Sequence, residues 1–189
     1  MTKETLKKPG SPGFSLIEIL IVLAMALIMS AFAIPTLSSA MRDMQILAEA
    51  RNISSTLNHA RLKAASLMNR YRVSFDLANN QWRLEKFNSA TNNFDLQQDV
   101  NELSRGLAGS GITFKTRSAS HPGTFPIDSS NTIEFNSLGI PVNGSNVPTS
   151  ANIIYITKSD TDFAVTVTLT GKVQIWKKGE AQWDALAHQ

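Results

Sequence analysis

The sequence predicts an α+β fold in which a long N-terminal helix packs on an antiparallel β-sheet domain. Three observations lead to this prediction: an apolar run from Phe14 to Ile34, an apolar stripe with helical spacing after it, and a two-residue period from Tyr71 onward. With 189 residues, of which 42% are hydrophobic, the chain has the size and core of one folded domain. The expected parts are a leader at 1–13, a membrane-spanning and assembly segment at 14–35, an amphipathic continuation of the helix at 36–70, and a β-rich globular domain at 71–189.

The apolar run from Phe14 to Ile34 contains one charged residue, Glu18. At about 1.5 Å per residue, this run forms a helix of about 31 Å, which matches a hydrocarbon core of roughly 30 Å. A carboxylate inside such a span needs a positive partner, and the run contains no Lys or Arg. A cut after Gly13 supplies that partner, because the new amine on Phe14 lies one helical turn from Glu18.

The segment GFSLIEIL at 13–20, preceded by three lysines, resembles the prepilin signal of type IV pilins and type II secretion pseudopilins. In that family a membrane aspartic peptidase, the prepilin peptidase, cleaves after the glycine and methylates the new amine. The resemblance implies cleavage after Gly13 and N-methylation of Phe14. It also implies that the helix packs against other pilins or pseudopilins, with Glu18 as an assembly contact.

Two other interpretations of the N-terminal segment remain. An ordinary secretory signal also has basic residues, an apolar stretch and a small-x-small cleavage site, which Ala31-Phe32-Ala33 supplies. Glu18 weakens that apolar stretch, however, and Pro35 lies just beyond the cut, where it hinders a peptidase. A plain single-pass anchor accounts for the length of the run but not for the glutamate after Gly-Phe.

Most of the net positive charge lies in the leader. The formal net charge is +3, of which residues 1–13 carry +2 through three lysines and one glutamate. Because positive residues beside a span tend to stay cytoplasmic, the leader is expected inside and everything after Pro35 outside. Together with the resemblance to pilins and pseudopilins, this implies a single-pass protein of the bacterial inner membrane. Its N-terminus is cytoplasmic and its globular domain periplasmic, before it enters a pilus or pseudopilus. The absence of cysteine excludes disulfides, thiolate metal sites and a cysteine nucleophile.

After the span, apolar residues recur at steps of three and four, which indicates a helix that continues to about Arg70. Pro35 interrupts this helix near the membrane exit. Because proline removes a backbone hydrogen bond, we expect a kink there, with a helix end as the alternative. The apolar stripe consists of Ile46, Ala50, Ile53, Leu57, Ala60, Ala64, Leu67 and Tyr71.

From Tyr71 to Leu84 apolar and polar residues alternate around Ala78-Asn79-Asn80, which predicts a β-hairpin. The stretch 88–126 is rich in Ser, Asn, Gly and Thr and is predicted as a loop-rich connection. One face of the sheet must be covered, and the helix stripe is the only long amphipathic surface available. Besides the hairpin, we expect a weak strand at 112–114 and strands at 132–135, 152–157, 163–169 and 173–176, the last three as an antiparallel meander.

The C-terminal half resembles the globular domain of the H/FimT group of minor pilins and pseudopilins. In that group a Phe-x-x-x-Gly segment precedes two strands, and a Gly-Lys/Arg-Val turn leads into the last strand. The glycines are expected in turns that need a positive φ. The matching positions are Phe135, Gly139, Gly171, Lys172 and Val173, and Trp82 resembles a position of the first hairpin.

No catalytic residue, metal site or cofactor is predicted. The histidines lack metal-ligand spacing, no serine lies in G-x-S-x-G, and the glycines form neither a P-loop nor a dinucleotide turn. Asp160 and Asp162 offer oxygens to Ca²⁺, but a solvated turn is the preferred interpretation. We therefore expect a protein that is not an enzyme. The histidines tested for metal-ligand spacing are His59, His121 and His188, and the glycines tested for a phosphate-binding loop are Gly106, Gly109 and Gly111.

The preferred function is that of a minor pilin or pseudopilin acting in initiation or at the filament tip. The alternative is a DNA-uptake minor pilin, because some FimT-type minor pilins are associated with DNA uptake through basic residues near the C-terminus. Acidic residues interleave with the basic ones here, and the tail lacks arginine, which weighs against nucleic acid. Candidate phosphate contacts are Lys172, Lys177 and Lys178, with Trp176 and Trp183 nearby for stacking.

Overall fold

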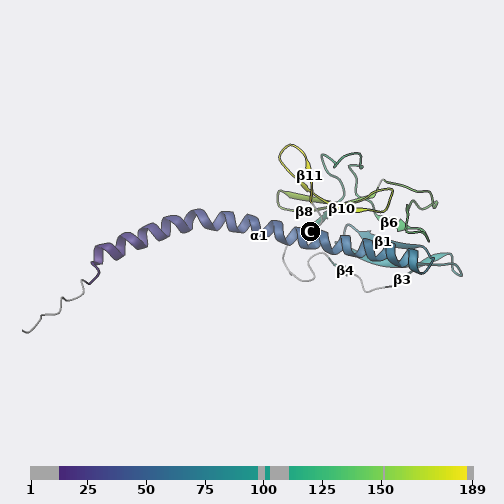
Figure 1. Cartoon of the computed structure of the whole chain (residues 1–189), viewed down its shortest axis with the longest axis horizontal. Coiled ribbons are helices and arrows are strands. Elements are labelled where there is room, and N and C mark those ends of the chain that lie inside the picture. The colour runs from purple at the N-terminus through teal and green to yellow at the C-terminus, as the bar shows by residue number, and fades with distance from the viewer. Residues whose placement is uncertain (1–12, 98–100, 103–110, 151, 187–189) are drawn as a thin grey trace, which may run out of the picture. The chain divides into compact units, whose positions relative to one another are not determined.

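The computed structural model describes residues 13–97, 101–102, 111–150 and 152–186, without the side chains of 32–36 and 101–102. The chain divides into two compact units, Met1–Met41 and Arg42–Gln189. Within the described residues it contains the helix α1, Leu16–Ser66, and strands in two sheets (Figure 1). The strands are β1 Tyr71–Asp76, β2 Gln81–Asn88, β3 Asn93–Leu96, β4 Asn101–Glu102, β5 Thr113–Lys115, β6 Thr132–Phe135, β7 Pro141–Val142, β8 Asn152–Lys158, β9 Thr161–Val167, β10 Val173–Lys178 and β11 Trp183–Leu186.

The helix α1 continues through position 35, so the interpretation that the helix ends at Pro35 is wrong. The side chain of Pro35 lies outside the described residues, and the kink stays a prediction. In the described part of the chain, no helix combines the length and the apolarity needed to cross a membrane. The membrane-spanning segment expected at 14–35 likewise stays a prediction.

The C-terminal end of α1 lies at Ser66, four residues earlier than expected. Met68 adopts a left-handed φ of 47°, and the N–H of Asn69 donates to the carbonyl of Ala64 at 3.2 Å. This is the hydrogen bond of a Schellman motif, with Met68 in the position that glycine usually takes. The predicted stripe was therefore wrong at its end, because Leu67 is exposed and Tyr71 is buried as the first residue of β1.

The first sheet has the order β3-β2-β1-β6-β7, and β4 pairs with β2. The hairpin of β1 and β2 is confirmed, with Val73 opposite Leu84 and Phe75 opposite Trp82. All four of these side chains are buried, as the alternation predicted. The turn between the strands has its left-handed residue at Asn80, whose φ is 55°. Asparagine tolerates this conformation better than most residues do.

The second sheet has the order β11-β10-β9-β8-β5. The expected meander corresponds to β8, β9 and β10, which pair as antiparallel neighbours. The sequence analysis expected one sheet, and the structure corrects this to two. The two sheets meet where Phe114 of β5 packs edge-on against Phe75 and Trp82, with ring centroids 5.8 and 6.2 Å apart.

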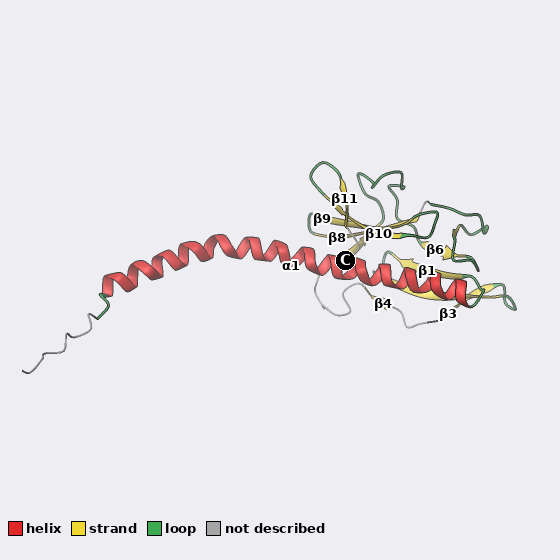
Figure 2. Ribbon diagram, in the orientation of Figure 1, coloured by secondary structure: helices red, strands yellow, loops and turns green. Residues whose placement is uncertain are grey.

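The core of the second unit forms between α1 and both sheets (Figure 2). The apolar stripe of α1 is fully buried from Ile46 to Ala64, which confirms the α+β fold with the helix packed on antiparallel sheet. The fully buried members of the stripe are Ile46, Ala50, Ile53, Leu57, Ala60 and Ala64.

A smaller cluster covers the opposite face of the second sheet. Ile153, Tyr155 and Ala164 are fully buried there, against Phe125 from the loop before β6 and two tryptophans. The hydroxyl of Tyr155 donates to the carbonyl of Pro126 at 2.8 Å. The loop after β5 thus contributes to the core, so β8 has apolar side chains on both faces. The tryptophans are Trp176 and Trp183.

Four strands were absent from the sequence prediction: β3, β4, β7 and β11. Strands β3 and β11 have four residues each and no fully buried side chain, so neither presents the buried face that marks a half-buried strand. Both strands of two residues, β4 and β7, are too short to show a period. These four strands are recognised by their pairing with neighbouring strands, and not by a pattern in their own sequences.

Met68→Gly should raise the free energy of unfolding by about 0.5 to 1 kcal/mol, because glycine adopts a left-handed φ without the steric cost of a Cβ. Urea unfolding of the purified protein measures this change. Leu67→Gly is the matched control, since Leu67 is also exposed but has no positive φ. The control should lose stability. A loss in both variants contradicts the assignment of Met68 as the left-handed cap.

Candidate functional site

The N-terminal end of α1 places Glu18 in the first helical turn. The carbonyl of Ser15 accepts hydrogen bonds from the N–H groups of Glu18 at 3.0 Å and Ile19 at 3.2 Å. Ser15 is therefore the N-cap, and Ser15-x-x-Glu18 has the sequence of a capping box. A carboxylate in the first turn is also stabilised by the helix dipole. Glu18 thus contributes to the start of its own helix.

Phe14 and Glu18 lie on one side of the helix start. Together with Ile19, Val22 and Leu23 they line a shallow, almost entirely apolar hollow in the surface. Phe14 and Glu18 thus line the same hollow. Gly13 lies in open space, because no heavy atom lies within 4 Å of the position of an added Cβ. Cleavage after Gly13, methylation of Phe14 and the assembly role of Glu18 stay predictions.

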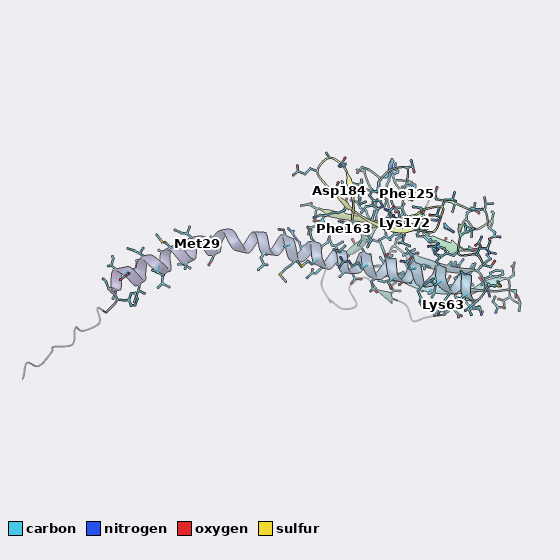
Figure 3. All side chains as sticks on the ribbon, viewed as in Figure 1. Met29, Lys63, Phe125, Phe163, Lys172 and Asp184 are labelled. Atoms are coloured by element: carbon cyan, nitrogen blue, oxygen red, sulfur yellow. The ribbon has the colours of Figure 1, made fainter. Side chains whose placement is uncertain are left out.

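The first half of α1 presents a continuous row of exposed apolar side chains. From Phe14 to Met29 the large apolar residues are between 49% and 81% exposed, and Glu18 is the one charged residue among them. Figure 3 shows these side chains projecting from the ribbon, with Met29 labelled. Isolated exposed apolar residues are normal, but an uninterrupted row of this length indicates a contact surface.

Arg61 in the second half of α1 lies close to two turns of the globular domain and hydrogen-bonds one of them. Its guanidinium donates to the carbonyls of Gly171 at 3.0 Å and Thr170 at 3.1 Å. Gly139 and Gly171 have φ values of 73° and 77°, which confirms the expected positive φ. A Cβ on Gly171 would lie 2.7 Å from Arg61 Nε, and one on Gly139 would lie 3.3 Å from Arg61 Cγ. Both turns therefore need glycine for φ, and at Gly171 an added Cβ would also force Arg61 to shift.

Sequence reasoning missed the role of Arg61. Arg61 follows Ala60 of the buried stripe, and its partner Gly171 lies 110 residues away in the chain. A charged residue at the edge of an apolar stripe is the one available signal, since it suggests a polar contact at the rim of the packed face. The sequence gives no indication that this contact is with the Gly-Lys-Val turn.

The three tail lysines do not form one basic patch. Lys177 Nζ lies 2.5 Å from Asp43 Oδ2 on α1, and Lys178 Nζ lies 3.6 Å from Asp162 Oδ2. Lys172 is exposed in the turn between β9 and β10. Two of the three candidate phosphate contacts are thus already paired with carboxylates of the same chain.

Asp162 is a buried lysine partner and not half of an acidic turn. Lys115 Nζ lies 2.9 Å from its Oδ2. Burial raises the pKa of Asp162, but hydrogen bonds with Lys115 and Thr157 and the lysine charges outweigh it, so the pKa lies below its usual value. Asp160 is exposed in the turn between β8 and β9. Across the described ranges no group of three or more histidine or acidic side chains is placed to hold a metal ion.

The histidines are separated in the fold. His59 lies on α1 and His121 lies in the loop after β5. His188, Gly106 and Gly109 lie outside the described residues. Gly111 has a φ of 65° with open space around it, as a loop glycine does.

The family described as type II transport protein GspH matches residues 49–171, which is well over half of the chain. The chain belongs to the GspH family. Its match begins beside Ala50 in the buried stripe and ends at Gly171, so it contains both glycine turns and Arg61. The resemblance to minor pilins and pseudopilins is confirmed.

Two solved structures are similar to this chain. The type IV minor pilin FimU of Pseudomonas aeruginosa shares the fold, with a TM-score of 0.50 and 14% identity over 73% of this chain and 91% of that chain. The minor pseudopilin EpsH of the Vibrio cholerae type 2 secretion system gives a TM-score of 0.49 and 13% identity over 70% of this chain and 97% of that chain. No curated protein sequence matches the chain.

Membership of the GspH family defines the general class of function. The chain is a minor pseudopilin or minor pilin of type II secretion or type IV pili. Proteins of this class are structural subunits that assemble with other pilins or pseudopilins, and they are in general not enzymes. The pseudopilin family is anchored in the inner membrane.

Gly171→Ala should lower the free energy of unfolding by about 2 to 3 kcal/mol, because it adds the cost of a left-handed alanine to the displacement of Arg61 from two carbonyls. The matched control is Gly111→Ala, where φ is also positive but space is open. The control should lose about 1 kcal/mol. Urea unfolding of both variants measures the difference, and equal losses contradict a packing role for Arg61.

Proposed function

We propose that this GspH-family subunit is processed after Gly13, anchored in the inner membrane by residues 14–35, and assembled through α1 into a pseudopilus or pilus, in initiation or at the tip. The observation that carries the proposal is the row of exposed apolar side chains from Phe14 to Met29, with Glu18 as its single charge. A surface of this kind needs lipid or other apolar helices as its surroundings. The leader is cytoplasmic and the domain at 71–189 periplasmic.

Prepilin peptidase is the partner that the junction at Gly13 requires. Gly13 lies just before the first turn of α1 with no neighbouring side chain against it, which suits a scissile bond that must enter an active site. The cut leaves a free amine on Phe14. Methylation then keeps the positive charge while adding a methyl group.

Glu18 gives the assembled helices a defined axial position. When two processed subunits pack in an apolar environment, the amine of Phe14 in one can pair with Glu18 of the next. Leaving either charge alone in such surroundings costs several kcal/mol, so the register that joins them is strongly preferred. A subunit at the tip has no subunit ahead and leaves one of these groups free for another contact.

The alternative of DNA uptake finds no supporting contact. Lys177 and Lys178 are paired with Asp43 and Asp162, so Lys172 is the remaining candidate among the three. One free lysine neutralises too little phosphate charge to hold duplex DNA at physiological salt. We therefore propose packing, and not nucleic-acid binding, as the function.

Mass spectrometry of the membrane-extracted protein should give an N-terminus at methylated Phe14. Gly13→Ala should leave the longer, unassembled precursor, because the proposed cut requires glycine, which has no side chain, at this position. Ala33→Leu is the control, since it removes the alternative small-x-small site and should leave processing unchanged. An N-terminus at Ile34 in the wild-type protein contradicts the proposal.

Glu18→Gln should insert and be cleaved normally but enter the filament poorly. Glutamine also completes a capping box, so the helix start is kept while the charge is lost. Incorporation is measured by co-purification or crosslinking with the other filament subunits. Glu180→Gln, an exposed carboxylate on the turn before β11, is the matched control and should behave as wild type. Normal incorporation of Glu18→Gln would show that the carboxylate is not an assembly contact.

A further inference from the structure

An open cavity lies on the face of the second sheet that is turned away from α1. From β10, Lys177 reaches Asp43 on α1, so Lys178, the next residue of the strand, points to the opposite, outer face. Trp183 of β11 is directly opposite Lys178, and directly opposed side chains share a face. Figure 1 shows the turn between these two strands, in yellow, on the side of the sheet away from α1. The cavity has a volume of about 380 Å³ and is lined by Ser120, His121 and Gly123 of the loop after β5 and by residues 178–183.

Trp183 is the aromatic wall of this cavity, and its ring is held in one orientation. The indole N–H donates to Ser120 Oγ at 3.0 Å. The ring packs on Tyr155, with centroids 5.7 Å apart, and Tyr155 is itself fully buried and fixed by its hydrogen bond to Pro126. Trp183 nevertheless keeps part of its surface exposed. A planar apolar surface that is ordered before binding loses little conformational entropy when a ligand stacks on it.

The rest of the lining is mainly polar, and its charges cancel. Lys178 and Glu180 carry opposite charges, and the other polar side chains include those of His121 and Gln182. Lys178 Nζ also lies 3.6 Å from Asp162 Oδ2, so the ammonium already has a carboxylate partner and does not require an anionic ligand. Ammonium, imidazole, amide and carboxylate groups together supply both donors and acceptors of hydrogen bonds. The cavity therefore suits a ligand that has many hydroxyl groups and no net charge.

We propose that this cavity binds a neutral saccharide, with a sugar ring stacked on Trp183 and its hydroxyls hydrogen-bonded to Glu180 and Gln182. A pyranose ring has C–H groups on its faces, which pack on the negatively polarised face of an indole, and hydroxyls around its rim. The cavity volume lies within the roughly 300 to 1,000 Å³ that is typical of small-molecule sites. A nucleotide fits less well, because its phosphates need unpaired cations and Lys178 is shared with Asp162. Saccharide binding goes beyond the filament assembly proposed above and uses other residues.

Isothermal titration calorimetry tests the proposal with the purified full chain in a zwitterionic detergent, which has no sugar headgroup to compete. The probes are the uncharged tetrasaccharides maltotetraose, cellotetraose, mannotetraose and chitotetraose. At least one should bind with a Kd below about 1 mM. Because no ion pair forms with the ligand, this Kd should change less than about twofold between roughly 0.05 and 0.5 M NaCl. Binding of none of the four overturns the proposal, as does tighter binding of a tetranucleotide with a steep salt dependence.

The aromatic wall is tested by Trp183→Leu, which keeps an apolar side chain against Tyr155 but removes the planar face. This variant should bind the saccharide about tenfold more weakly, whereas Trp183→Phe, which keeps a ring, should lose less. Trp176→Leu is the matched control, because Trp176 packs in the same small cluster but is not part of the cavity lining. The control should bind as the wild type does. Equal losses in Trp183→Leu and Trp176→Leu overturn the stacking role of Trp183.

The polar lining is tested by Gln182→Ala, which removes one hydrogen-bonding group from an exposed turn and should raise the Kd about fivefold. Gln97→Ala is the matched control, since Gln97 is also exposed but lies just after β3 of the first sheet. A Kd unchanged in Gln182→Ala overturns the role of this turn in binding. Circular dichroism melting confirms that each variant is folded. The same variants should enter the filament normally, so a failure of saccharide binding leaves the proposed function standing.

Discussion

The buried stripe of α1 from Ile46 to Ala64 is the contact on which both sheets of the domain depend. Three of its six members are alanines, which let the strands approach the helix closely, while Ile53 and Leu57 are fully buried in the core that α1 shares with both sheets. Fully burying one such large side chain contributes about 1.5 to 3 kcal/mol. The indole N–H of Trp82 also reaches Thr56 Oγ1 on α1 at 3.3 Å, so the largest core side chain buries its polar atom without leaving it unpaired.

The stripe and the hairpin were predictable because each depends on a short local period. The end of the helix was not, because Met68 takes a left-handed conformation that no sequence rule assigns to methionine. The division into two sheets also escaped prediction. It depends on which strands pair, and β1 pairs with β6 across more than fifty intervening residues. A period reports which face of a strand is buried, but not which neighbour it has.

The glycine turns show the same limit at the candidate site. A positive φ at Gly139 and Gly171 follows from the turn sequences, and the structure confirms it. Their second constraint, close approach to Arg61, joins residues that are 78 positions apart for Gly139 and 110 for Gly171, and it leaves no local signature. The N-terminal segment is the opposite case. Gly13, Phe14 and Glu18 lie within six residues, and Phe14, just before α1, lines the same hollow as Glu18.

The tail lysines show why charged residues that are adjacent in the sequence do not form one charged patch when they lie in a β-strand. Lys177 and Lys178 are neighbours in β10, and successive side chains of a strand point to opposite faces. Lys177 lies on the face of Ile175 and reaches Asp43 on α1, whereas Lys178 turns to Asp162 on the other side. Lys177 therefore joins the second sheet to α1, and Lys178 joins β10 to β9 within that sheet. Lys172 precedes the strand and is exposed in its turn, and among the described residues it forms no ion pair.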